Sequence, residues 1–189
     1  MPKKMSKGFY IGGYIIGLVI SIIFTIVIVV ADIWFVAQHP DDPPLLLLVG
    51  LAALCIIPLA FSLTIFFMFI YRMWAAIQDS YVRMTPGKAV GFLLIPVFNF
   101  YWLFHVFHGF AYDYNEYVKR RKLNLPQLDE QLFRYYPIAV LCLLVPFVGT
   151  LAWPVGLVLL VIIMSKTCDA INALSAVQQA APATDATPA

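Results

Sequence analysis

Charged residues are scarce in this chain. Asp, Glu, Lys and Arg together make up 12% of its 189 residues, while 62% of the residues are hydrophobic. A soluble globular domain has about 25% charged and roughly 45–50% apolar residues. The deficit of charge excludes a water-soluble protein and predicts an integral membrane protein whose surface faces lipid or other helices. The lipid bilayer is therefore the first expected partner, and no nucleic-acid partner is expected.

Cysteine is scarce as well. The three cysteines, Cys55, Cys142 and Cys168, lie in or just after apolar runs and form no CxxC pair. An odd number without metal-site spacing disfavours a disulfide framework and a zinc site built on thiolates. We expect these residues to be buried as small hydrophobic side chains, and we predict no metal and no cofactor.

The chain also lacks the residue patterns of common enzymes. No Ser-His-Asp set, glycine-rich phosphate loop or acidic pair stands out in the sequence. Because an ion path usually needs carboxylates inside the membrane, we expect a non-enzymatic accessory or interaction protein. The polar groups deep in the apolar runs are hydroxyls, which usually bond to the backbone or to a neighbouring helix: Ser21, Thr25, Ser62, Thr64 and Thr150.

Long apolar runs dominate what is present, and they predict an all-α membrane protein. We expect one helical membrane domain over residues 1–179 and a disordered tail at 180–189. The run from Phe9 to Ala31 exceeds the roughly 7–15 residues of a signal-peptide core, so it is expected to remain as a helix. The expected helices cover about residues 9–36, 45–84, 86–95, 99–121, 127–145 and 152–178.

A stripe of small residues follows one face of the first helix. Such residues allow another helix to approach closely, either the second helix of this chain, which we favour, or a second copy. The stripe consists of Gly13, Gly17, Ser21 and Thr25.

The second helix is predicted to be unusually long. If it continues from residue 45 to 84, it measures about 60 Å and projects into water. Arg72, Asp79 and Arg83 then fall on one side of it, with Asp79 and Arg83 one turn apart.

Proline interrupts the next apolar run. Thr85 and Pro86 predict a helix start, with Thr85 as the N-cap and Pro86 as the first helical residue. Pro96 ends the short run, and Asn99 is predicted to cap the helix that follows.

A later run is broken in a similar way. Val145–Gly149 matches Ile95–Asn99, and each stretch is followed by an apolar helix and then by an Asp/Asn pair. The pairs are Asp113/Asn115 and Asp169/Asn172. The match is either a weak internal repeat of a helical hairpin or a coincidence between apolar segments.

The basic residues favour one topology. Lys3, Lys4 and Lys7 place the N-terminus in the cytoplasm. If both broken runs are re-entrant hairpins, all 12 Lys and Arg lie on the cytoplasmic side. If the runs span instead, four segments cross and a basic loop lies outside. We favour two transmembrane helices plus two hairpins, although the arm 86–95 covers only about 15 Å, half of the hydrocarbon core.

The helix over 99–121 is amphipathic, and its polar side fits a membrane interface or a wet cleft. The candidate polar face consists of His105, His108, Tyr112 and Glu116. A basic cluster follows, which is a candidate contact for anionic lipid or a protein partner. It consists of Lys119, Arg120, Arg121 and Lys122.

The segment TPGKAVGFLLIPVFNFYWLF resembles small bacterial integral-membrane families of unknown function. TPGK is also similar to a piece of the bacterial family named for its Arg-Asp-Asp membrane residues, but the arginine inside the first helix is missing here. The resemblance implies a protein of the bacterial inner (cytoplasmic) membrane, often found beside signalling or protein-binding modules, without established catalysis. The matching residues are Gly87, Gly91, Pro96, Asn99 and Trp102.

Two other functions remain open. A small transporter or oligomeric channel would line a site at the broken helices with Asn99, His105 and His108. A metal or haem site would use the two histidines, with Glu116 on the same face. A homo-oligomer is compatible with each of these functions.

Overall fold

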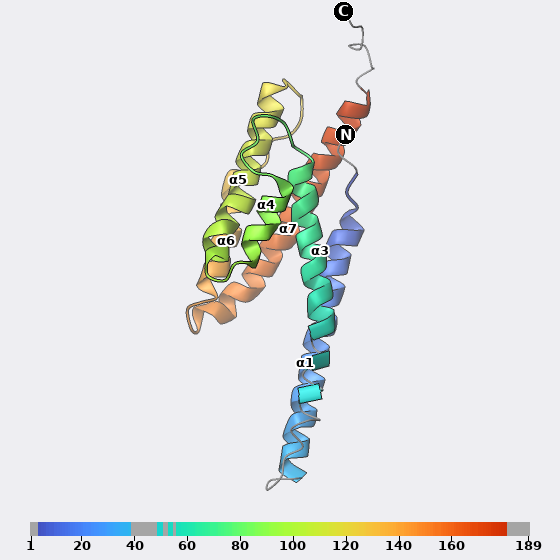
Figure 1. The fold of residues 1–189 in the computed structure, drawn as a ribbon, viewed down its shortest axis with the longest axis vertical. Coiled ribbons are helices and arrows are strands. Elements are labelled where there is room, and N and C mark those ends of the chain that lie inside the picture. The colour runs from blue at the N-terminus through green and yellow to red at the C-terminus, as the bar shows by residue number, and fades with distance from the viewer. Residues whose placement is uncertain (1–3, 39–48, 51–52, 55, 181–189) are drawn as a thin grey trace, which may run out of the picture. The chain divides into compact units, whose positions relative to one another are not determined.

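The computed structural model of the chain describes residues 4–38, 49–50, 53–54 and 56–180. Within these ranges all regular structure is helical, which confirms the all-α prediction (Figure 1). The elements are η1 (Gly8–Gly12), α1 (Gly13–Gln38), α3 (Ile56–Ala75), α4 (Pro86–Gly91), η2 (Phe92–Leu94), α5 (Phe98–Arg120), α6 (Glu130–Cys142) and α7 (Val148–Ala180).

Within the described residues, three stretches are long and apolar enough to cross a membrane. They are Gly8–Gln38, Ile56–Ala75 and Val148–Ala180. By helix composition the chain is therefore a multi-pass membrane protein. The third stretch corrects one boundary: α7 begins at Val148 rather than at residue 152, and it contains Pro154. Pro154 lies inside α7, in its second turn, where it has no N–H to donate to the Thr150 carbonyl.

The contacts divide the chain into two compact units. One is Gly8–Met68, and the other combines Met1–Lys7 with Phe69–Ala189. In the first unit, Gly13 and Gly17 lie against α3 of the same chain. A Cβ at Gly17 would collide with Ser62 Oγ and lie 2.9 Å from a ring carbon of Phe61. Further along the stripe, the Thr25 hydroxyl donates to the Ser21 carbonyl over 2.8 Å.

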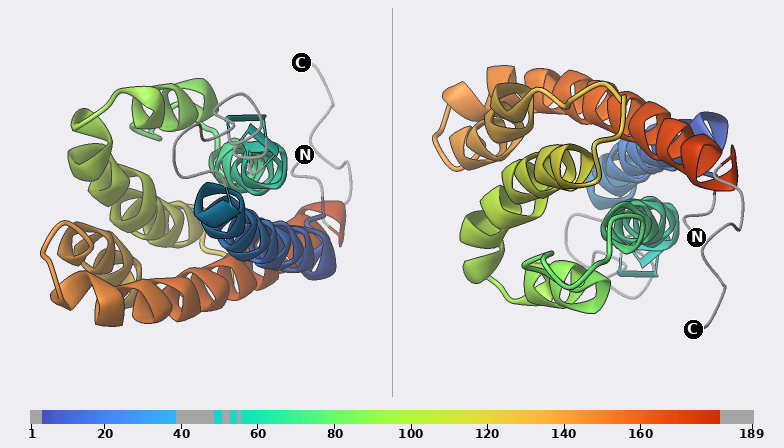
Figure 2. Two further views of the ribbon diagram at one scale, coloured as in Figure 1. Left: turned by 90° about the horizontal axis from the view of Figure 1, so that it is seen from below. Right: turned by 90° about the horizontal axis from the view of Figure 1, so that it is seen from above.

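The second unit is built from two helical hairpins. The first hairpin comprises α4, η2 and α5, and the second comprises α6 and α7. Aromatic contacts join α5 to α6, with Phe107 and Tyr136 ring centroids 4.7 Å apart. In Figure 2, α6 lies between α5 and part of α7. The largest fully buried side chains of this unit include Trp74, Phe110, Tyr114, Phe133, Leu160 and Met164.

The second predicted helix is shorter than expected at its C-terminal end. Residues 45–48 lie outside the described residues, but α3 ends at Ala75 rather than at residue 84. The Asp79 carboxylate accepts from the backbone N–H groups of Tyr81 and Val82 over 2.9 and 3.1 Å. This local turn replaces the helix because an Asp side chain competes well for nearby backbone donors.

The other boundaries differ by a few residues. Asp129 caps α6, so this helix covers 130–142 rather than 127–145. At the far end α7 reaches Ala180, and the predicted tail from 181 onward lies outside the described residues.

The prediction that Asn99 caps α5 is wrong. The helix begins at Phe98 with Val97 as the N-cap residue, whose φ is 67°. The backbone N–H of Asn99 donates to the Ile95 carbonyl over 3.0 Å, so this residue already belongs to the first turn. Its side-chain Oδ1 is buried and accepts no hydrogen bond from any described residue.

Both broken runs adopt the same turn, which supports the internal repeat. Val97 and Phe147 each follow a proline and have φ values of 67° and 64°. In the first turn the Phe98 N–H donates to the Pro96 carbonyl over 2.7 Å. In the second turn the Val148 N–H donates to the Pro146 carbonyl over 2.8 Å. Two side chains in this rarely populated conformation mark a specific local structure.

Candidate functional site

A cleft of about 250 Å³ lies between the end of α3, the loop 76–85, α4 and α5. All of these residues belong to the second unit. We call it the α4–α5 cleft. It is lined by Trp74, Arg83, Met84, Lys88, Phe92, Trp102, His105, Gly109 and Asp113.

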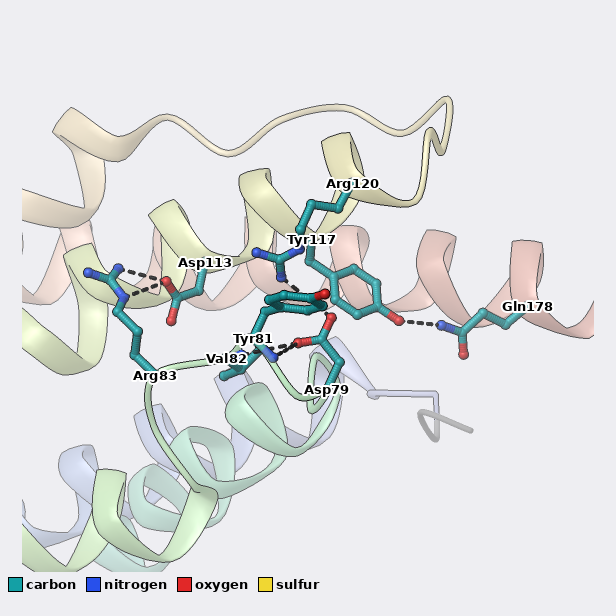
Figure 3. Close-up of polar contacts among 8 residues, drawn as sticks. All are labelled: Asp79, Tyr81, Val82, Arg83, Asp113, Tyr117, Arg120 and Gln178. Carbon is teal, nitrogen blue, oxygen red and sulfur yellow. Dashed lines mark hydrogen bonds and ion pairs between the residues drawn. The ribbon is translucent and has the colours of Figure 1, made fainter.

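One end of the cleft holds an ion pair in which only one of the two carboxylate oxygens has a partner among the described residues. Arg83 Nη2 and Nε lie 2.6 and 2.8 Å from the same oxygen, Asp113 Oδ1 (Figure 3). The Asp113 side chain is 7% exposed and that of Arg83 is 61% exposed. Asp113 Oδ2 is buried and accepts no hydrogen bond from any described residue. The carboxylate therefore keeps one buried oxygen with unused acceptor capacity.

A buried donor lines the same cleft. Trp74 is 1% exposed, and its Nε1–H has no acceptor among the described residues. Its indole packs edge-on against Phe110, with ring centroids 5.7 Å apart, and this contact holds the ring in place. Buried polar groups are nearly always hydrogen-bonded, so two residues of one lining that each keep an unpartnered buried polar atom are unusual.

The other end of the cleft is aromatic. Trp102 Nε1 donates to the Ala89 carbonyl over 3.3 Å, which ties α5 to α4. Phe92 meets Trp102 edge-on at 4.7 Å, and the His105 ring stacks on Trp102 at 5.4 Å. The cleft therefore changes from charged at Asp113 to apolar at Phe92.

A second polar network, beyond Arg83, joins the end of α5 to the loop 76–85 and to α7. Arg120 Nη2 lies 3.4 Å from Asp79 Oδ2, and its guanidinium covers the Tyr81 ring at 5.0 Å. The Tyr117 hydroxyl accepts from Gln178 Nε2 over 2.9 Å, so α5 is linked to α7 at this level (Figure 3). The loop 76–85 is thus fixed against α5, which positions Arg83.

The predicted polar face of α5 does not form one site. His105 lines the α4–α5 cleft, whereas His108 and Glu116 are half-buried outside the lining set. Tyr112 is exposed and stacks under the Arg83 guanidinium at 4.7 Å. Among the described residues, no three His, Cys, Asp or Glu side chains gather as metal ligands do. The His105 ring instead contacts the Tyr101 hydroxyl at 3.3 Å.

The basic cluster after α5 is partly engaged inside the chain. Lys119 Nζ lies 3.2 Å from Glu116 Oε1, and Arg121 covers the Tyr117 ring at 4.6 Å. Arg120 pairs with Asp79 as described above. Lys122 is exposed with φ 51°. The cluster therefore offers a smaller free positive charge than its sequence indicates.

The predicted motif around α4 has a clear structural role at its start. The Thr85 side chain accepts from the Lys88 N–H over 3.4 Å and Pro86 opens the helix, as predicted. Gly87 and Gly91 are exposed, and a Cβ at either would meet no atom within 4 Å. Close packing therefore does not require these two glycines.

Two asparagines hold the second unit together in the same way. Asn115 accepts from the Leu128 N–H over 2.8 Å and donates to the Leu128 carbonyl over 2.9 Å. Asn172 accepts from the Met5 N–H over 2.7 Å and donates to the Met5 carbonyl over 2.9 Å. Each amide thus fixes both backbone groups of a distant residue, which extends the likeness between the two hairpins.

No family model, curated protein or solved structure matches the chain. Its class follows from its own fold and composition: a multi-pass helical membrane protein, with three candidate spans in the part of the chain that the structure describes.

Proposed function

We propose that this chain is a non-enzymatic accessory or interaction protein of the bacterial inner membrane. Its two hairpins enter the membrane from the cytoplasmic side, and its polar end contacts anionic lipid or a partner protein. The observation that carries this proposal is the position of the two turns. Both turns lie at one end of the second unit, and the loops 76–85 and 121–129 lie at the other (Figure 1). The ion pair between Arg120 and Asp79 joins α5 to the first of these loops.

The turns expose apolar side chains as a lipid-facing surface does. Val97 is 81% exposed and Phe147 is 89% exposed, and exposed Leu94 and Leu144 lie beside them. In water, two such patches on one small unit would favour aggregation. In hydrocarbon, the same side chains are stabilised by their surroundings.

At the end of the second unit opposite the two turns, polar residues from distant parts of the sequence lie close together. The Met5 backbone bonds to Asn172, and Lys7 Nζ lies 2.8 Å from Asp169 Oδ2. Because the N-terminus carries three lysines, this end is assigned to the cytoplasm. The basic cluster Lys119–Lys122 covers the C-terminal end of α5, at the same end of the unit, where Tyr117 bonds to Gln178.

The lengths of the helices fit this insertion. At 1.5 Å per residue, α5 rises about 24 Å from Val97 to Asp113, and α7 about 28 Å from Phe147 to Lys166. Both values approach the roughly 30 Å of the hydrocarbon core. The arm formed by α4 and η2 is shorter, and α5 packs beside it, as broken segments inside membranes require.

Cysteine labelling tests the insertion. The native cysteines are replaced, and Asn124→Cys, in the exposed loop after α5, is treated with an impermeant maleimide. We expect no labelling in intact cells and full labelling once they are opened. Labelling from outside would overturn the proposed topology. A matched Ala75→Cys variant, exposed at the end of α3, is expected to behave in the same way.

One observation favours a transporter or channel as a second candidate. Asn99 presents a buried, unsatisfied Oδ1 at the broken segment, as ion or substrate sites in interrupted helices do. Flux in liposomes that is lost in Asn99→Ala would favour transport over the accessory function. If liposomes that contain well-folded protein show no more flux than protein-free liposomes, this candidate is removed.

A further inference from the structure

We propose that the α4–α5 cleft binds the headgroup of one phospholipid, and that this headgroup combines a phosphodiester with a hydroxyl donor, as a phosphatidylglycerol headgroup does. This inference rests on the proposed function because it needs the cleft to open at the cytoplasmic membrane interface. It adds a ligand and a defined site to a function that otherwise names only a surface.

The polarity of the cleft follows the polarity of a lipid. Asp113 and Arg83 lie at one end, and Phe92 and Trp102 lie at the other. Along α5, the distance from Asp113 to Trp102 is about 16 Å at 1.5 Å per residue. Beyond Phe92 the chain continues into the exposed apolar turn at Val97. A lipid headgroup at the charged end therefore leaves its acyl chains directed along the apolar turn.

The cations of the cleft suit a phosphate. Arg83 uses two of its five N–H groups on Asp113, and its exposed guanidinium keeps others for phosphate oxygens. Lys88 lines the cleft from α4. Arg83, Lys88 and the buried Asp113 carboxylate together carry a formal charge of +1, which matches one phosphodiester.

Two residues of the lining each keep an unsatisfied buried polar atom, and in this proposal small shifts of their side chains on binding bring these atoms to the headgroup. Trp74 Nε1–H needs an acceptor, which a phosphate or ester oxygen supplies. Asp113 Oδ2 needs a donor. Because Arg83 already lies against this carboxylate, an ammonium group there would meet a like charge. A neutral hydroxyl meets the same requirement without that repulsion.

Native mass spectrometry of the full chain in detergent tests the site. The probes are phosphatidylglycerol, phosphatidylethanolamine and phosphatidylcholine with identical acyl chains. We expect one bound phosphatidylglycerol per chain, weaker phosphatidylethanolamine binding, and little phosphatidylcholine, whose choline has no donor. Stronger binding of phosphatidylethanolamine than of phosphatidylglycerol would overturn the proposed hydroxyl donor. Equal binding of all three lipids would overturn the proposal.

Matched variants separate the cleft from general attraction to the basic surface. Lys88→Gln removes a cation inside the cleft, and Lys122→Gln removes one outside it. We expect Lys88→Gln to weaken phosphatidylglycerol binding about fivefold and Lys122→Gln to leave it nearly unchanged, since each interfacial cation has a modest effect. Equal losses in both variants would show a diffuse basic surface and no site.

A further pair of measurements identifies the source of the ligand and the donor. Trp74→Phe keeps an aromatic ring but removes the N–H, and we expect a severalfold loss of phosphatidylglycerol. Soluble glycerol phosphate is expected to compete poorly, because it lacks the acyl chains that the apolar turn contacts. Full competition would assign the site to a free phosphate ester. Lipid selectivity in detergent and the labelling of Asn124→Cys in cells are independent, so failure of the site and failure of the topology are distinguishable.

Discussion

The two hairpins share the same backbone turn, but the cavities beside them are lined by different side chains. Each has a proline followed by a residue with positive φ, at Val97 and at Phe147. The first hairpin borders the α4–α5 cleft, with two cations and a carboxylate. The second encloses a groove of about 510 Å³ whose lining, from Tyr135 to Leu159, is almost entirely apolar. The comparison indicates that the turn is a scaffold and that the lining gives each hairpin its role.

The largest expected difference lies at the position after each turn. A Cβ at Gly149 would lie 2.9 Å from the Leu143 carbonyl oxygen, and no flexible side chain can yield there. Gly149→Ala is therefore expected to destabilise the second hairpin by about 3 kcal/mol. The equivalent Asn99→Ala removes an unsatisfied buried oxygen and should be neutral or stabilising by up to about 1 kcal/mol. Thermal unfolding of both purified variants in detergent checks this, and equal losses would contradict the contrast.

The two asparagine contacts offer the next comparison. Asn115→Ala leaves two buried backbone groups of Leu128 without partners from this side chain and is expected to cost about 2 kcal/mol. Asn172→Ala frees Met5, near the start of the chain, and is expected to cost about 1 kcal/mol. Amide hydrogen exchange is the direct measurement. Faster exchange should be confined to Leu128 in the first variant and to Met5 in the second. Exchange that accelerates throughout α5 in both would contradict separate roles.

Two ion pairs, Arg83–Asp113 and Lys7–Asp169, differ in the burial of their carboxylates, and the third prediction compares them. Asp113→Asn removes a buried charge beside Arg83 and is expected to cost about 1.5 kcal/mol, because the exposed guanidinium stays hydrated. Asp169→Asn removes a carboxylate whose side chain is 61% exposed, and the expected cost is below about 1 kcal/mol. Unfolding at low and high salt distinguishes them. Added salt should weaken the Lys7–Asp169 contribution most, and an equal salt response in both variants would show that burial does not separate the pairs.

Local signals predicted part of this structure well. The effects of Thr85 and Pro86 are confined to the first turn of α4, and the helix start that they predict is present. The spacing of Asp79 and Arg83 is compatible with a helix, yet each residue finds a better interaction elsewhere. Asp79 binds the backbone of its own turn, and Arg83 reaches a carboxylate 30 residues away.

The cleft itself could not be predicted from the sequence. Its residues come from four segments. Trp74, Arg83 and Asp113 come to line one cleft only when the loop 76–85 packs on α5. One available signal was the repeated Asp/Asn pair after each broken run. That signal located Asp113 and Asn115 on α5 without showing which groups they bind.

The smallest expected effect concerns the turns themselves. A β-branched residue with φ near 67° is strained, and glycine adopts this conformation without cost from a Cβ. Val97→Gly is therefore expected to stabilise the purified protein in detergent by about 1 kcal/mol, and Phe147→Gly by somewhat less, since phenylalanine is not β-branched. If the chain keeps these strained side chains because they contact lipid, the gain should disappear in bilayers. Unfolding measured in detergent and in nanodiscs tests this, and an equal gain in both would mean that lipid contact does not offset the strain.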